Sequence, residues 1–220
     1  LRQPLKTVRI LFEKTGRAVY ISHLDLMRVM QRTLRRAGLP VWYTQGFNPH
    51  IYLTFALPLS LGYEGRREPM DFRLLEDMPF DEAARRITEA APDGIRALSA
   101  AEPVMEPTDI MWADYEISFV SDAAQPREAF LRFLGRDGIL AEKKSKKGMQ
   151  IIDLRPLFSA SEVAGEGLLT RFSLRARAGT AVNLNPALLL EAFARGEGCS
   201  ILQKKVVRTA ILNTNFEEFI

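Results

Sequence analysis

Two histidines are the side chains of this 220-residue chain best suited to acid–base chemistry near neutral pH. His23 lies at the start of a predicted helix, on the apolar side that also carries Met27 and Met30. It is either a partly buried residue that hydrogen bonds a loop carbonyl, or a general base or phosphate contact at a helix N-terminus, where free N–H groups attract anions. Asp25 points away from His23, so it suits the helix cap or a pair with Arg28 better than a His–Asp dyad.

The second histidine closes the sequence GFNPH at residues 46–50. Gly46 permits a positive φ, Asn48 can cap its own turn, and Pro49 fixes the exit into a strand. Phe47 is then either tucked into the core by a rigid turn, or exposed beside His50 to stack on a base or contact a phosphate.

The two histidines fall at the ends of elements that a sheet can bring together. We therefore predict one concave pocket lined by His23, Asn48 and His50, to which Lys14 and Arg36 add positive charge. Such a pocket would suit a phosphate or a nucleobase, because the first-turn N–H groups of the helix favour an anion. His23 and His50 are also the candidate catalytic residues of an enzyme.

The charged residues are arranged in blocks. Residues 1–50 hold nine basic and two acidic side chains, residues 51–142 nine and eighteen, and residues 143–208 twelve and five. Two basic blocks around an acidic one either form a surface that faces a polyanion or neutralise one another across the molecule.

The second basic block predicts a surface for a nucleic-acid backbone. In TRFSLRARA (170–178) apolar and basic residues alternate, so one face of the predicted strand is apolar and the other carries three arginines. The lysines lie at the tip of the preceding hairpin and on the last strand, and they serve either phosphate binding or solubility. The predicted nucleic-acid-binding residues are Lys143, Lys144, Lys146, Lys147, Arg171, Arg175, Arg177, Lys204 and Lys205.

The composition excludes several classes of protein. One cysteine, Cys199, rules out an internal disulfide framework and a multi-cysteine metal site, and no Walker loop, dinucleotide fingerprint or H-E-x-x-H motif occurs. No apolar run approaches the roughly 20 residues that cross a bilayer, and no signal peptide opens the sequence, so we expect a cytoplasmic location without membrane contact. Because the sequence starts at Leu1, we expect it to be a piece of a longer protein.

The elements that position these residues follow one order twice. Residues 6–16 predict a strand and a turn, 18–21 a short strand, and 22–38 a helix that starts at Ser22 and carries an arginine ridge outside. Strands are predicted at 41–44 and 51–59, and the proline-rich segment 101–109 predicts a linker. The expected fold is α+β, with two ferredoxin-like halves at 1–104 and 111–220 that pack helices on antiparallel sheets.

Several motifs resemble those of the radical SAM-linked protein family, a bacterial domain of unknown function. They are F-x-K-x-G at 12–16, SHLD at 22–25, RAGLP at 36–40, GFNPH at 46–50 and DLR at 153–155. The resemblance implies a partner, because such domains are fused to, or encoded beside, a radical SAM protein. That enzyme needs three cysteines for its iron–sulfur cluster, so the cluster and S-adenosylmethionine are expected only in the partner, and no cofactor is expected in this chain.

Three functions remain open from the sequence. The preferred one is a non-catalytic RNA-binding accessory module of a radical SAM protein, joined in cis or in trans and acting on structured RNA. The second is a metal-independent endoribonuclease of ferredoxin-like fold that uses His23 or His50 as acid or base. The third is a protein-interaction scaffold whose basic surface meets an acidic partner.

Overall fold

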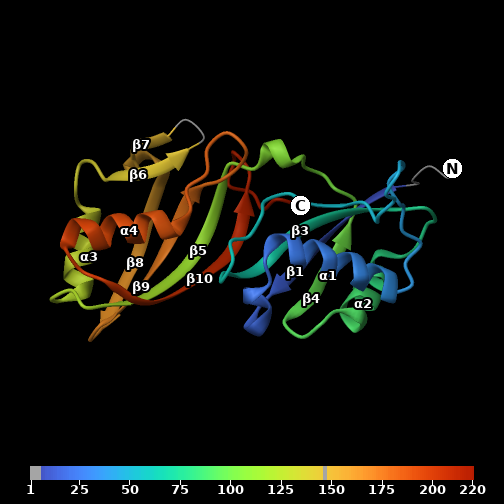
Figure 1. Cartoon of the computed structure of the whole chain (residues 1–220), viewed down its shortest axis with the longest axis horizontal. Helices are drawn as coiled ribbons and strands as arrows, with labels where there is room; N and C mark the ends of the chain where they lie inside the picture. Colours follow the sequence, from blue (N-terminus) through green and yellow to red (C-terminus); the bar gives the residue numbers. More distant parts are fainter. Residues whose placement is uncertain (1–5, 146–147) are drawn as a thin grey trace. The chain divides into compact units, whose positions relative to one another are not determined.

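The computed structural model describes residues 6–145 and 148–220. The chain divides into two compact units: unit 1 is Leu1–Ile110 with Glu217–Ile220, and unit 2 is Met111–Phe216. Each unit packs α-helices on an antiparallel sheet, so the α+β class is confirmed (Figure 1). None of the helices in the described part of the chain has both the length and the apolarity needed to cross a membrane.

The sheet of unit 1 has β1 (Lys6–Lys14) as an inner strand. On its two sides lie β4 (Ile95–Ala101) and β3 (Glu64–Leu74), and β2 (Leu53–Phe55) pairs with the far edge of β3. All these pairings are antiparallel. Because side chains alternate along a strand, one face of β1 is apolar, and its residues Val8, Ile10 and Phe12 are buried.

Two helices cover this apolar face. Helix α1 (His23–Arg36) starts at Ser22, whose Oγ accepts from the Asp25 backbone N–H at 3.2 Å and whose hydroxyl donates to the Asp25 carboxylate at 2.7 Å. The apolar side of α1 and Ile87 of α2 (Phe80–Ala90) pack in one core with β1 and β3. The buried residues of α1 are Leu26, Met30, Thr33 and Leu34.

The short strand predicted at residues 18–21 is wrong. This segment forms a 3₁₀ helix, η1 (Gly16–Tyr20), because the side chain of Lys14 turns it back over the end of β1. The Lys14 ammonium group is buried and donates to the carbonyl oxygens of Val19 at 3.3 Å and Ile21 at 3.0 Å. A buried ammonium needs such acceptors, so the segment follows the lysine rather than its own strand propensity.

Unit 2 repeats the element order of unit 1. Its inner strand β5 (Trp112–Ser121) lies between β10 (Ile201–Leu212) and β9 (Leu169–Arg177), and β8 (Phe158–Glu166) pairs with the far edge of β9. In unit 1, β2 pairs with β3, and β1 lies between β3 and β4; in unit 2, β8 pairs with β9, and β5 lies between β9 and β10.

The helices of unit 2 are α3 (Pro126–Leu134) and α4 (Pro186–Glu197), which begins after the cap Asn185. They cover one face of the sheet with a cluster of phenylalanine rings. The rings of Phe119 and Phe130 are 5.2 Å apart, and those of Phe130 and Phe172 are 4.6 Å apart. Rings this close pack edge-to-face or tilted, which stabilises the face that the helices cover.

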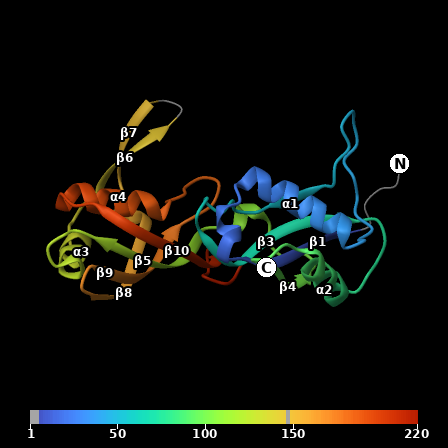
Figure 2. The ribbon, with the colours of Figure 1, turned by 60° about the horizontal axis from the view of Figure 1, so that its bottom comes forward.

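A hairpin interrupts this order between α3 and β8. Strands β6 (Leu140–Ser145) and β7 (Gly148–Asp153) pair with each other in a separate two-stranded sheet. Figure 2 shows this hairpin standing away from the larger sheet of unit 2. The sequence predicts the hairpin but not β8, whose small and polar residues lack a clear alternation and whose pairing is broken by a bulge between Ser161 and Ala164.

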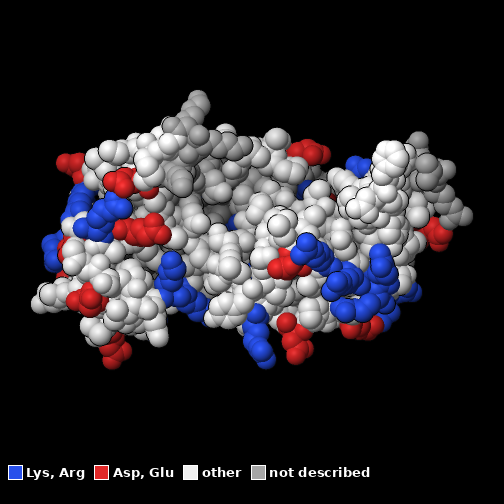
Figure 3. All heavy atoms as spheres, viewed as in Figure 1, with Lys and Arg blue, Asp and Glu red and all other residues white. Residues whose placement is uncertain are grey.

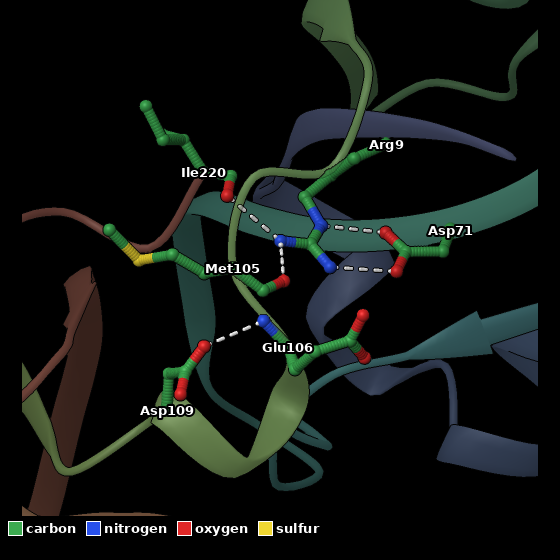
Figure 4. Close-up of polar contacts among 6 residues, drawn as sticks. All are labelled: Arg9, Asp71, Met105, Glu106, Asp109 and Ile220. Atoms are coloured by element: carbon green, nitrogen blue, oxygen red, sulfur yellow. Dashed lines mark hydrogen bonds and ion pairs between the residues drawn. The ribbon is translucent and has the colours of Figure 1, made fainter.

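The C-terminal residues belong to unit 1, whereas the sequence groups them with the second half. The buried Arg9 guanidinium explains this placement (Figure 4). It makes two parallel hydrogen bonds to the Asp71 carboxylate, at 2.7 and 2.8 Å, and its Nη1 donates to the carbonyl oxygens of Met105 and Ile220, at 2.9 and 3.0 Å. The Phe219 ring lies 4.2 Å from the same guanidinium.

We expect Arg9→Met to lower the free energy of unfolding by about 3–5 kcal/mol, because it leaves the mostly buried Asp71 carboxylate without its cation. The double variant Arg9→Met/Asp71→Leu should regain part of this loss, since it removes the unpaired carboxylate as well. Urea unfolding followed by circular dichroism measures both values. Equal stability of the wild type and the single variant would contradict this assignment.

Candidate nucleic-acid interface

His23 lies at the first residue of α1 and is held by packing. Its imidazole ring contacts the ring of Phe55 in β2, with the ring centroids 5.5 Å apart, and the side chain is half-buried. Among the described residues the His23 side chain makes no hydrogen bond, so the predicted contact with a loop carbonyl is not formed.

Residues 42–52 form a narrow arm between α1 and β2, which Figure 2 shows rising away from the helix. The two sides of the arm are joined by the bridge between Tyr43 and Ile51 and by the hydrogen bond from Tyr52 N to Trp42 O, at 3.1 Å. The strands predicted at 41–44 and 51–59 therefore shrink to these bridges and to the three residues of β2, because the chain leaves the sheet here.

The tip of the arm exposes an aromatic side chain. Gly46 adopts a φ of +127°, a region that favours glycine, and Phe47 beside it is fully exposed. The interpretation in which Phe47 tucks into the core is therefore wrong. The structure instead agrees with the second interpretation, in which Phe47 is exposed on a turn that also carries Asn48 and His50.

Hydrogen bonds around His50 fix this turn. The Thr44 N–H donates to the His50 carbonyl at 2.8 Å, and the His50 N–H donates to Thr44 Oγ1 at 3.1 Å. The imidazole Nδ1 lies 3.0 Å from the Asn48 carbonyl oxygen. Nδ1 also lies 3.1 Å from Thr44 Oγ1, whose hydroxyl can donate to it, so these contacts are compatible with either tautomer of His50.

The two histidines do not share a pocket. His50 hydrogen bonds Thr44 and Asn48 on the arm, whereas the His23 ring packs on Phe55 of β2. The arm joins α1 at a later turn, where Gln31 Nε2 donates to the Ile51 carbonyl at 3.1 Å. Gln31 comes eight residues after His23, about 12 Å further along the helix axis.

Lys14 and Arg36 do not complete the predicted pocket either. Lys14 is buried at the η1 turn, as described above. Arg36 lies at the opposite end of α1 and donates to the Ala90 carbonyl at 2.6 Å, at the last residue of α2. Of the residues of the predicted pocket, the structure brings Asn48 and His50 into contact, at the turn of the arm.

The outer side of α1 carries a row of exposed arginines, and in Figure 3 basic side chains gather over this helix. Arg28 pairs with Asp25 at 2.9 Å, and the Asp25 hydrogen bonds to Ser22 and Arg28 hold the pKa of this carboxyl below its usual value. The side chains of Arg32 and Arg35 make no hydrogen bond or ion pair with any described residue.

Helix α2 shows the opposite arrangement. Arg85 pairs with Glu89 at 2.7 Å, and Arg86 pairs with Glu82. These i,i+4 pairs neutralise the arginines of α2 locally. The unpaired positive charge of the two helices therefore lies on α1, on the helix that also contacts the arm.

The base of the arm is a stack of aromatic rings and a guanidinium. Trp42 and Tyr52 lie edge to face with their ring centroids 5.8 Å apart. Arg73 of β3 lies over both rings, 4.3 Å from Tyr52 and 5.4 Å from Trp42. This cation–π contact ties the arm to the sheet.

The open face of the unit 2 sheet carries the predicted arginines of β9, but carboxylates accompany them. Arg175 makes two hydrogen bonds to Asp114, at 2.7 and 2.8 Å, and this carboxylate raises the pKa of Arg175. Arg177 lies 4.9 Å from the Trp112 ring, and Arg171 has no partner among the described residues. Glu116 lines a hollow of about 390 Å³ beside Arg175, so the predicted basic platform is of mixed charge.

The predicted lysines are spread over two places. Lys204 and Lys205 are exposed on β10, opposite Phe119 and Ser118 of β5, so they point to opposite faces of the sheet. Lys143 and Lys144 lie in β6, opposite Gln150 and Met149 of β7. Lys146 and Lys147 lie outside the described residues.

The DLR sequence at 153–155 closes the base of the hairpin. Asp153 Oδ1 accepts from the backbone N–H of Arg155 at 3.0 Å and from that of Ile139 at 2.9 Å. These two hydrogen bonds, in that order of importance, hold the pKa of Asp153 below its usual value. The Asp153 carboxylate therefore has a structural role: it holds together the two chain segments at the base of the hairpin.

Metal and thiol chemistry find little support. Residues 6–145 and 148–220 contain no group of three or more His, Cys, Asp or Glu side chains placed to hold a metal ion. Cys199 is half-buried, and burial is the main cause that raises the pKa of its thiol. A raised pKa disfavours the reactive thiolate.

Comparison with known proteins identifies the family of this chain. The model of a family described as "Uncharacterized protein conserved in bacteria (DUF2344)" matches residues 7–186, and the chain belongs to this family. No curated protein matches the chain.

Two solved structures match this chain over most of its length. A Cbf5–Nop10–Gar1 complex matches with a TM-score of 0.52 and 11% identity, over 93% of this chain and 48% of the other. The Nop10–Cbf5 complex of an archaeal box H/ACA sRNP matches with a TM-score of 0.49 and 10% identity, over 96% of this chain and 49% of the other. This chain thus spans about half the length of the chains it matches, and at this identity the first match shows similarity of fold alone.

We expect the base of the hairpin to open in acid. Because the pKa of folded Asp153 is lowered, its stabilising contribution is present above the ordinary Asp pKa and is lost as the pH falls through the lower, folded value. Hydrogen exchange measured by NMR should show the amides of Ile139 and Arg155 losing protection below about pH 4. Asp153→Ala should show the same weak protection at neutral pH, and full protection in this variant would contradict the assignment.

Proposed function

We propose that this chain is a non-catalytic RNA-binding module that serves a radical SAM protein. The observation that carries this proposal is the arm, which holds Phe47 fully exposed on a fixed turn beside a helix with two unpaired arginines. An exposed aromatic residue and nearby cations are the two groups with which proteins bind unpaired nucleotides.

The tip of the arm fits base stacking. A large apolar side chain with no protein neighbour gains from a partner that covers its ring, and every nucleobase has such a face. Because the His50–Thr44 hydrogen bonds already fix the turn, binding orders few additional groups. His50 is exposed on the same turn, and its imidazole can hydrogen bond a ribose hydroxyl or a base edge.

The arginines of α1 fit the phosphate backbone. Arg32 and Arg35 have no protein carboxylate to displace, so a phosphate meets an available guanidinium, whereas Arg85 and Arg86 of α2 would first have to break their pairs. In unit 2, Arg171 and Lys204 are exposed and unpartnered among the described residues, and they offer further backbone contacts.

We assign both units to the ferredoxin-like class. This assignment is supported by the strand–helix–strand–strand–helix–strand order and by the position of the first strand between the third and the fourth. The likeness to the Cbf5 complex concerns the fold, and the RNA proposal therefore rests on the surface of this chain alone.

The accessory role rests on the resemblance to radical SAM-linked proteins, which implies such a partner in cis or in trans. With a single cysteine in this chain, the iron–sulfur cluster and S-adenosylmethionine would belong to that partner. The separation of His23 from His50 gives no support to an endoribonuclease that uses the pair. In this role the chain holds the RNA and the partner performs the reaction.

We expect Phe47→Ala to weaken binding of a labelled single-stranded RNA by roughly 5- to 150-fold, since stacking on one base contributes about 1–3 kcal/mol. Phe47→Trp should bind at least as tightly as the wild type, and Phe47→Leu should lose most of the affinity. Leu61→Ala, which truncates another exposed apolar residue of unit 1, is the control. Fluorescence anisotropy measures the affinities, and a denaturing gel of the same samples should show intact RNA. Equal affinity of all variants would overturn the role of the arm, and cleaved RNA would instead support the endoribonuclease.

We expect Arg32→Gln/Arg35→Gln to flatten the dependence of RNA affinity on salt. Each lost phosphate contact should lower the slope of log affinity against log salt concentration by roughly 0.7–0.9, so the pair should lower it by about 1.4–1.8. The matched control is Arg85→Gln/Arg96→Gln, because both of these exposed arginines already pair with carboxylates. If the wild-type protein binds no RNA at low salt, the RNA proposal is refuted. The protein-interaction scaffold would then be the remaining function.

A further inference from the structure

Unit 1 has a pocket on the open face of its sheet, opposite the face that α1 and α2 cover. Its volume is about 560 Å³, within the range of roughly 300–1,000 Å³ that small-molecule sites occupy. The start of β1 and the end of β3 form its floor, with Thr7 and Asp71 among the lining residues. Tyr52 and Thr54 form one wall, and the linker at 102–107 forms the other.

The linker wall is held firmly in place. The Arg9 guanidinium binds the Met105 carbonyl on the linker and Asp71 on β3 at the same time (Figure 4). The linker then enters the 3₁₀ helix η2 (Pro107–Asp109), where the Glu106 N–H donates to Asp109 Oδ2 at 2.8 Å and the two residues form a capping box. The pocket is therefore preformed on this side.

Most of the charged side chains that line the pocket already have partners within the protein. The lining contains three basic and three acidic side chains, so it has no excess of positive charge for a polyanion. Arg9 binds Asp71, Lys6 pairs with Asp77, and Glu106 belongs to the capping box.

Two opposite charges remain. Arg73 stacks on Tyr52 and Trp42 but has no carboxylate partner among the described residues, and Glu102 has no partner among them either. Although both line the same pocket, they do not pair with each other. The stack restricts the Arg73 guanidinium plane while its N–H groups stay available to a ligand.

We propose that this pocket binds a small zwitterion of the α-amino acid class, with its carboxylate on Arg73 and its ammonium group on Glu102. A guanidinium and a carboxylate that face one cavity without pairing are complementary to a ligand that carries both charges. The hydroxyl groups of Thr7, Thr54 and Tyr52 supply further hydrogen bonds to such a ligand. The site uses neither Phe47 nor the α1 arginines, so it is independent of the proposed RNA contacts.

The test is a calorimetric and NMR titration of the full chain with each of the common free L-amino acids. At least one of them should bind with a dissociation constant below about 10 mM. Its N-acetyl derivative, which lacks the ammonium group, and its amide, which lacks the carboxylate, should each bind about tenfold or more weakly, because each loses one charge-assisted contact. Failure of all the amino acids to bind, or equal binding of either derivative, would overturn the proposal.

Two variants locate the site. Arg73→Gln and Glu102→Gln should each weaken amino-acid binding about tenfold or more, whereas Glu89→Gln, an exposed carboxylate outside the pocket, should not. Circular dichroism checks that the variants are folded. Glu102→Gln should also leave RNA binding unchanged, so a failure of this proposal is distinguishable from a failure of the RNA proposal. Unchanged amino-acid binding in both variants would place the ligand elsewhere and refute the pocket.

Discussion

The buried guanidinium of Arg9 is the contact on which unit 1 depends. A charge with 3% of its area exposed must be fully compensated, and here a carboxylate, two carbonyl oxygens and an aromatic ring surround it. These groups come from β3, from the linker and from the last residues of the chain. One side chain thus joins three segments that are far apart in the sequence, and it gives the linker a fixed path across the open face of the sheet.

The charges of unit 1 divide into those that build the structure and those that remain available. Lys14, Arg9 and Arg36 look equally basic in the sequence, yet each of them binds a carbonyl oxygen or a carboxylate of the fold itself. Arg32 and Arg35 have no such partner among the described residues. The distinction matters for function because a ligand gains little from a cation whose hydrogen bonds are already made.

Local patterns in the sequence predicted the parts of the fold that depend on neighbouring residues. The Ser22 cap and the apolar side of α1 follow from spacing along one helix, and the alternation of β9 follows from the period of a strand. What the patterns missed depends on contacts distant in sequence: the C-terminal residues return to unit 1 through Arg9, and the edge strand β8 has few apolar residues to mark it. The site showed the same limit, because GFNPH predicts a turn correctly, but only the surrounding chain decides that Phe47 points outward and that His50 lies far from His23.

The β6–β7 hairpin differs from every other strand pair in what its length controls. Its strands pair with each other outside the main sheet; Asp153 ties their base to unit 2, and Glu142 of β6 pairs with Arg195 of α4 at 3.2 Å. Lengthening or shortening the hairpin by one residue in each strand therefore alters no register in the core, but it flips the side chains beyond that point to the opposite face. A change of two residues in each strand preserves the facing and moves the tip by about 7 Å. Among related chains, the length of this hairpin can thus change while the sheet that carries it keeps its register.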